Sequence, residues 1–318
     1  MTNRGHSSSV IRMGLIDSIL NVVALLLWFN WRTARFDPLA GSTPATLAGT
    51  LRRAGSPTLK NWLVPLAIPA LLLLRALFYW QIGGALGWTA KIDVGVIAIP
   101  FWCDISRAGL GRMLLFSFYS FGVALTVFNL WLLLLSIVKS KNTDADSLRQ
   151  LLRAHLGRAE TWPWWLKTLL PLLIITPAWW LASWPLTSTR LLPDPIFVMR
   201  RVEQSLLVGA GSYLCWKFFI VGLLALYFVS SYVHFGRHPF WQHLNEIGRQ
   251  LLSPLRWLPL RISRLDFLPI VGIVLILLLA QVMEHGVRTP RRFDAKGVER
   301  PRVVDIPGLV DLYRRVSS

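Results

Sequence analysis

The sequence predicts an all-α membrane protein, a polytopic bundle of about six transmembrane helices. Of the 318 residues, 54% are hydrophobic and only 16% are charged, with a mean hydropathy of +0.49. Soluble domains carry about a quarter charged residues, so much of this surface must face a solvent other than water. Apolar windows of about 20 residues, long enough to cross a bilayer, recur along the chain. Tryptophans gather near the window ends, as in interfacial aromatic belts.

The apolar windows group into three consecutive pairs. They cover residues 13–31, 61–82, 113–138, 165–186, 206–233 and 265–284. The first window is the least apolar, because Asp17 and Asn21 fall in its first half. No small-residue cleavage site follows it, so we expect a first span rather than a signal peptide.

Each pair of windows encloses a polar segment in which leucines stand beside arginines. These segments are residues 46–57, 147–158 and 243–254. Arg52, Arg153 and Arg249 occupy equivalent positions in them. Leucine beside arginine is typical of short amphipathic helices in the membrane interface, so we predict a threefold repeat of helix, interfacial helix and helix. Convergence is the alternative, since membrane loops commonly favour these residues.

The repeats define the domain organisation. It comprises an N-terminal tail (1–12), a first repeat (13–82), a connector (83–112), a second repeat (113–186), a connector (187–205), a third repeat (206–286) and a charged tail (287–318). The apolar stretch 91–106 is too short to span and is predicted to be re-entrant or interfacial. The tail is predicted to be flexible, apart from an amphipathic helix near 309–316.

The membrane orientation does not follow from the charges. Two spans return the chain to its starting side, so the three arginine-bearing segments share one side of the membrane. Basic residues divide equally between that side and the other, so the positive-inside rule assigns neither to the cytoplasm.

The most distinctive motif precedes the last window. Its prolines and charged residues are Pro254, Arg256, Pro259, Arg261, Arg264 and Asp266. Two prolines so close together forbid one regular helix, so the arginines sit in a constrained segment at the membrane surface. Asp266 is predicted to cap the helix that starts near Phe267, with Pro269 in its first turn. The arginines would bind lipid phosphate, or present a charged surface to a partner.

This motif resembles the signature of the YggT family of small bacterial and plastid membrane proteins. The family pattern is roughly P-L-R-P-x-R-R-x-x-P, a spacer, and D-x-S-P entering a helix. In this chain the arginines are more widely spaced and Leu268 replaces the serine. The resemblance covers residues 206–286 and implies a place in the cell inner membrane. It also implies roles in membrane organisation, such as cell division, nucleoid distribution or cytochrome-complex assembly, and a link to osmotic tolerance and potassium uptake.

Two basic residues fall inside predicted spans, Arg75 and Lys217. Intramembrane charges are functional candidates by default. The alternative is that Arg75 snorkels to an interface and that Lys217 sits near the start of its helix. No carboxylate is predicted to lie deep in a span and pair with either one.

The remaining residues argue against an enzyme, a cofactor or a metal site. The net charge of +18 fits anionic lipid headgroups better than nucleic acid, because no nucleic-acid-binding motif accompanies it. His234, His238 and His243 have suggestive spacing, but Pro239 interrupts their helix. Cysteines 103 and 215 are expected to be two buried thiols. No hydrolase, metalloprotease or phosphate-loop motif is present.

Two hypotheses from different classes follow. The first is a non-enzymatic scaffold or assembly factor whose arginine-rich hairpins engage protein partners or anionic lipid. The alternative is an ion channel or transport component linked to osmotic and potassium homeostasis, against which stands the predicted lack of intramembrane acids. A lipid-modifying enzyme is a weaker third option, and homo-oligomerisation stays open.

Overall fold

The fold is all-α, and the protein is a multi-pass membrane protein. The computed structural model describes residues 4–35, 58–83, 88–103, 106–138, 152–153, 155–193, 197–232, 239–255, 257, 261–262, 265–288 and 305–317. Within these ranges six helical segments are long and apolar enough to cross a membrane, which confirms the predicted class. They are Met13–Arg32, Pro65–Gly83, Gly109–Val138, Trp164–Ser188, Val198–Tyr232 and Leu268–His285.

The chain divides into two compact units. The first comprises Met1–Ile92, Ile99–Asn129 and Ser147–Gly157. The second comprises Asp93–Ala98, Leu130–Asp146 and Arg158–Ser318. The boundary passes through the long helix α4 (Arg107–Val138), so the units do not coincide with the predicted repeats.

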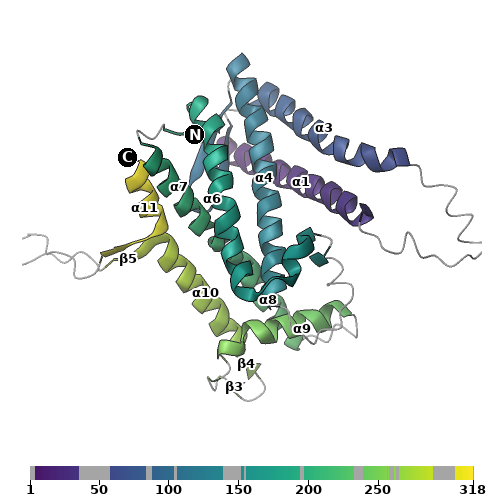
Figure 1. Ribbon diagram of the computed structural model, residues 1–318, viewed down its shortest axis with the longest axis vertical. Coiled ribbons are helices and arrows are strands. Elements are labelled where there is room, and N and C mark those ends of the chain that lie inside the picture. The colour runs from purple at the N-terminus through teal and green to yellow at the C-terminus, as the bar shows by residue number, and fades with distance from the viewer. Residues whose placement is uncertain are drawn as a thin grey trace, which may run out of the picture. The chain divides into compact units, whose positions relative to one another are not determined.

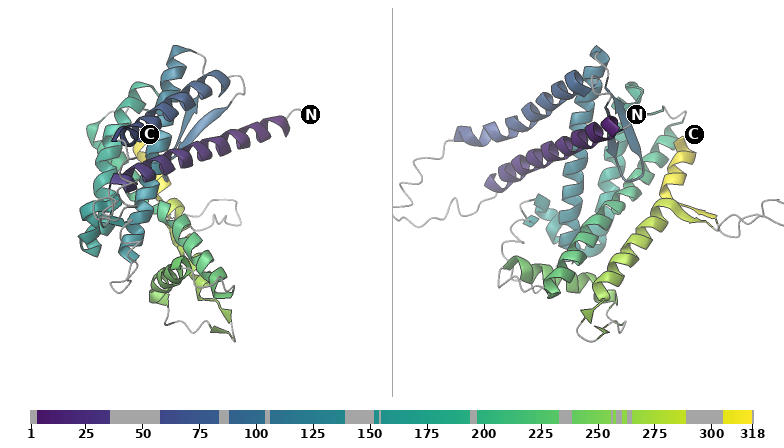
Figure 2. Two further views of the ribbon diagram at one scale, coloured as in Figure 1. Left: turned by 90° about the vertical axis from the view of Figure 1, so that its right-hand side faces the viewer. Right: turned by 180° about the vertical axis from the view of Figure 1, so that it is seen from behind.

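In the first unit, α1 (Arg4–Arg35) and α3 (Thr58–Gly83) lie side by side, as Figure 2 shows in purple and blue. Both pack against the N-terminal part of α4 through a small apolar core. Its buried residues are Ala24 of α1, Ile68 and Leu72 of α3, and Phe121 of α4. Exposed apolar side chains such as Leu15, Ile19 and Leu26 lie on another face of α1.

The stretch predicted to be re-entrant or interfacial forms a two-stranded hairpin between α3 and α4. Its strands are β1 (Thr89–Asp93) and β2 (Ala98–Trp102). Alternate residues are buried, among them Ile92, Ile99 and Phe101, as expected of strands with one covered face. Phe101 and Trp88 pack against Phe116 of α4. The ten residues of the two strands are too few to cross a bilayer as a strand pair. Their backbone N–H and C=O groups are satisfied by pairing between the strands.

The second unit begins with the end of α4 and continues through α6 (Trp164–Ser188), α7 (Val198–Gly211) and α8 (Cys215–Tyr232). The window predicted at 206–233 was wrong in its start and its continuity. The helical segment starts at Val198, and a 3₁₀ turn, η3 (Ser212–Leu214), interrupts it. Tryptophans brace this break, because Trp131 Nε1 donates to the Cys215 carbonyl at 3.2 Å and Trp216 Nε1 to the Leu130 carbonyl at 3.0 Å.

The third repeat has the predicted arrangement of helix, short helix and helix. After α8 come α9 (Pro239–Leu251), the turn η4 (Ser253–Leu255) and α10 (Leu268–His285). Figure 1 shows α9 lying across the ends of α8 and α10. In the first repeat the segment 46–57 lies outside the described residues. In the second, residues 152–153 and 155–156 are helical and η2 (Gly157–Thr161) follows.

The end of the tail is folded onto the second unit, which corrects the expectation of a free tail. Strands β5 (Gly286–Arg288) and β6 (Asp305–Pro307) pair at the end of α10, and α11 (Leu309–Ser317) follows. The predicted tail helix is thus confirmed, and it packs on α7 and α10 with Tyr313 only 6% exposed. Gly286 makes the turn possible, since its φ of +74° favours glycine and a Cβ there would meet the Ile306 carbonyl. Residues 289–304 lie outside the described part of the chain.

Candidate functional site

Within the proline- and arginine-rich segment the structure describes the turn η4, Trp257 and two short strands, and these parts together with α9 are called the platform. Arg261 and Asp266 are directly opposite each other in the antiparallel pair of β3 (Arg261–Ile262) and β4 (Leu265–Asp266). Pro254 is exposed in η4. The other predicted site residues of this motif, together with the arginine of the first segment, lie outside the described residues: Arg256, Pro259, Arg264 and Arg52.

Asp266 was predicted to cap the last helix, but it does not occupy the N-cap position. Helix α10 begins at Leu268 with Phe267 at its N-cap, and the Phe267 side chain makes no capping hydrogen bond. Asp266 lies one residue too early because β4 holds it opposite Arg261. The prediction for Pro269 is confirmed, since this proline lies in the first turn, where no backbone donor is needed.

Close packing holds α9 against its neighbours. Gly248 meets the Tyr227 side chain of α8, and a Cβ at this glycine would lie 2.5 Å from Tyr227 Cγ. Ser230 Oγ donates to Asn245 Oδ1 at 2.6 Å. Leu244 is buried. One face of α9 is therefore packed against α8, while Arg249 is exposed.

Trp257 is the residue of this platform that sequence reasoning missed. Its side chain is 79% exposed and stands one residue after Arg256. The signal was present, since a tryptophan among arginines is typical of a segment at the lipid headgroups. The predicted site comprised only the prolines and charged residues of this segment.

The second arginine-bearing segment is anchored within the first unit. Its His155 is buried, stacks on Phe29 with ring centroids 5.0 Å apart, and accepts a hydrogen bond from Arg32 at its carbonyl at 3.3 Å. Arg153 is exposed beside it. The local sequence does not indicate this packing, because the aromatic partners of His155 lie on α1 and α4.

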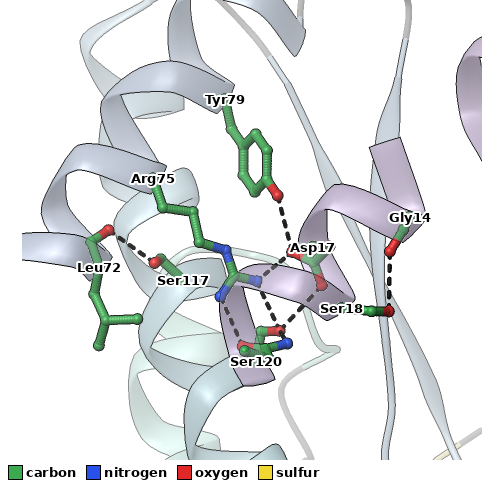
Figure 3. Close-up of polar contacts among 9 residues, drawn as sticks. Gly14, Asp17, Ser18, Leu72, Arg75, Tyr79, Ser117 and Ser120 are labelled. Carbon is green, nitrogen blue, oxygen red and sulfur yellow. Dashed lines mark hydrogen bonds and ion pairs between the residues drawn. The ribbon is translucent and has the colours of Figure 1, made fainter. Parts of the chain in front are cut away.

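Arg75 is the centre of a buried polar cluster that joins α1, α3 and α4 (Figure 3). It is 2% exposed, and its guanidinium forms an ion pair with Asp17. It also donates to Asn21 Oδ1 at 2.8 Å and to Ser120 Oγ at 2.9 Å. The Tyr79 hydroxyl donates to Asp17 at 3.2 Å. Every ionised group in this cluster is thus bonded to at least one polar partner.

The snorkelling alternative is wrong for Arg75, whereas Lys217 does lie near the start of its helix, as the alternative for that residue predicted. Arg75 does not snorkel, and a carboxylate does pair with it. Lys217, in the first turn of α8, likewise pairs with Glu284 of α10 at 2.8 Å. A third basic residue, Lys167, lies in the first turn of α6. It is buried and donates to Ser136 Oγ at 2.8 Å.

The described residues show no grouping of three histidine, cysteine or acidic side chains that could hold a metal ion. Cys103 and Cys215 are free thiols and are partly, not fully, buried. Burial raises the pKa of the Cys103 thiol, which keeps this residue in its protonated, unreactive form. These side chains therefore add no evident chemistry to the two polar sites.

Comparison with known proteins adds no relative to this description: no family model, no curated protein and no solved structure matches the chain. The class is established by the fold itself, a multi-pass α-helical membrane protein in a lipid bilayer.

Proposed function

We propose that this protein is a non-enzymatic scaffold or assembly factor of the cell inner membrane. The platform made by α9, η4 and the β3–β4 pair would engage anionic lipid headgroups or partner proteins. The single observation that carries this proposal is the 79% exposure of Trp257 in a segment whose sequence bears Arg256, Arg261 and Arg264. Exposed tryptophan with arginine suits a surface that meets phosphate or carboxylate groups at the membrane.

The support beneath the platform favours a docking role. Gly248, Asn245 and Leu244 hold α9 against α8, and a buried glycine of α10, Gly272, meets Leu252. A site held on rigid helices keeps its charged groups at a constant place relative to the membrane, which lowers the entropy lost on binding. The resemblance of the same segment to the YggT family points to the same kind of role in membrane organisation.

The test is in-cell crosslinking, followed by mild-detergent purification and mass spectrometry. The variant replaces Arg256, Arg261 and Arg264 by Ala, and the matched control replaces two exposed arginines of α11, Arg314 and Arg315. We expect the triple variant to insert normally but to lose its crosslinked partners or its preference for anionic over zwitterionic liposomes. The control should keep both. Unchanged partners and unchanged liposome binding in the triple variant would refute the proposal.

A second candidate is an ion channel or transport component linked to osmotic or potassium homeostasis. The observation in its favour is Asp17, which supplies the intramembrane acid that the sequence had been expected to lack. Arg75 also points into the helix cluster rather than toward lipid. Potassium flux into proteoliposomes decides between the candidates, with Asp17→Asn as the variant. No flux above that of protein-free liposomes would remove the second candidate.

A further inference from the structure

Each pair of consecutive crossing helices contains one basic side chain that bonds to its partner helix. Arg75 of α3 reaches α1, Lys167 of α6 reaches α4, and Lys217 of α8 reaches α10. The three contacts differ in their acceptors, which are an aspartate, a serine and a glutamate. They share one consequence, because in each pair a charge that lipid would exclude is satisfied by the neighbouring helix.

Of the two ion pairs, the one between α1 and α3 is the more deeply buried. Arg75 shows 1% of its side chain and Asp17 shows 18%, whereas Lys217 and Glu284 show 20% and 25%. The guanidinium also lies 5.3 Å from the ring centroid of Phe116 and 5.6 Å from that of Tyr79. Protein groups, rather than water, therefore surround most of the Arg75 side chain.

The face of α1 that meets α3 and α4 is polar at one end. Asp17 and Asn21 are one helical turn apart, and Ala24 continues the same face into the apolar core. The opposite face carries exposed apolar residues such as Ile19 and Val22. As a single helix α1 would therefore carry an ionised aspartate and an asparagine into lipid.

We infer that the Asp17–Arg75 pair is an insertion lock: α1 takes its transmembrane position by pairing with Arg75 of α3. Neither charge enters lipid favourably alone, but the pair has no net charge, and Asn21 and Ser120 each accept a further hydrogen bond from the guanidinium.

The requirement for this pair can be measured from the side of the membrane on which the N-terminus lies. When α1 spans, its two ends lie on opposite sides of the membrane. When α1 fails to insert, both ends lie on the side of the loop that follows it. On insertion scales, an unpaired aspartate at the centre of a span lowers the ratio of inserted to uninserted helix by roughly a hundredfold. Asp17 lies in the first half of its span, so we expect a smaller shift in the same direction. A protease-sensitive tag at the N-terminus measures the change.

The experiment uses the full chain in membranes, with a second tag at the C-terminus to show that the rest has inserted. We expect Arg75→Leu to move the N-terminal tag to the loop side in most chains. The double variant D17L/R75L should return it to the wild-type side, because the two leucines leave no charge to satisfy. Lys217→Met, in the other unit, is the control and should not move the tag.

Two results would overturn the inference. One is an unchanged tag position in Arg75→Leu, which would mean that α1 inserts without the pair. The other is a double variant as defective as the single one, which would mean that Arg75 acts other than by neutralising Asp17. Neither result depends on the arginine platform or on any flux, so the proposed functions are tested separately.

Discussion

Gly248 offers a sharp test of how α9 is held in place. Replacing it with alanine adds one methyl group at the point where α9 touches α8. The added Cβ would lie 2.5 Å from Tyr227 Cγ, 2.7 Å from Cδ2 and 2.9 Å from Cβ. Ordinary carbon contacts are about 3.5 to 4.0 Å, so the two helices must separate by about 1 Å. Rotating the tyrosine gives little relief, because its Cβ is itself one of the crowded atoms.

The magnitude follows from two opposing effects. Overpacking a well-filled contact costs about 1 to 3 kcal/mol. Replacing a helical glycine with alanine contributes up to about 1 kcal/mol in the other direction. The net expectation for Gly248→Ala is therefore a loss of about 1 kcal/mol in the free energy of unfolding, rising to about 2 kcal/mol if α9 cannot move.

The control is Gly222→Ala on α8, where an added Cβ meets nothing within 4 Å. This variant should be as stable as the wild type or slightly more so, because only the helix preference of alanine acts. Thermal unfolding of the purified chains in one detergent gives the comparison. Adding Tyr227→Ala to Gly248→Ala should remove the penalty of the added methyl group. If Gly248→Ala proves as stable as Gly222→Ala, the proposed contact between α8 and α9 is wrong.

Three further predictions concern the second unit. Glu284→Gln leaves Lys217 without its counter-charge, so we expect a loss of about 1 to 2 kcal/mol on unfolding in detergent, partly recovered when Lys217→Met is added. Burial raises the pKa of Tyr313 from its ordinary value of 10.0 to about 12. Since the folded state favours the neutral phenol, the docking of α11 is fully stabilised below pH 10 and weakens as the pH approaches 12. Tyr313→Phe should abolish that alkaline transition in the rate of tail proteolysis; a transition that persists would place its origin elsewhere. Gly286→Ala forces a side chain into a backbone with φ of +74° and against the Ile306 carbonyl. We expect it to open the β5–β6 pair and to speed proteolytic removal of α11, and an unchanged cleavage rate would count against this role of the turn.

Much of the architecture could be predicted because hydropathy is a local property. A window of about 20 apolar residues has few alternatives to a membrane span, and the windows coincide with described helices. The helix α11 was equally predictable, since its amphipathic pattern lies within nine residues. The break at Ser212–Leu214 was not, because the groups that brace it include Trp131, 84 residues from Cys215 in the chain.

The candidate sites, too, include residues that local sequence could identify and contacts that it could not. The motif around Pro254 and Arg261 was visible as a run of neighbouring residues, although only the structure shows that Arg261 stands opposite Asp266 and that Phe267 holds the N-cap position. The buried ion pair could not be predicted, because Asp17 and Arg75 are 58 residues apart in the chain. Each residue, considered alone, is an unfavourable charge in an apolar span.

The amino-acid sequence by itself determined that this chain is a multi-pass membrane protein and where its six apolar segments lie. These features follow from transfer free energies, which each segment has independently of its neighbours. Only the tertiary structure decided which charges neutralise each other, which face of α9 is buried, and that the tail folds back onto α10. Those outcomes depend on distances between groups far apart in the chain, and in a low dielectric such distances decide whether a charge destabilises the fold or joins two helices.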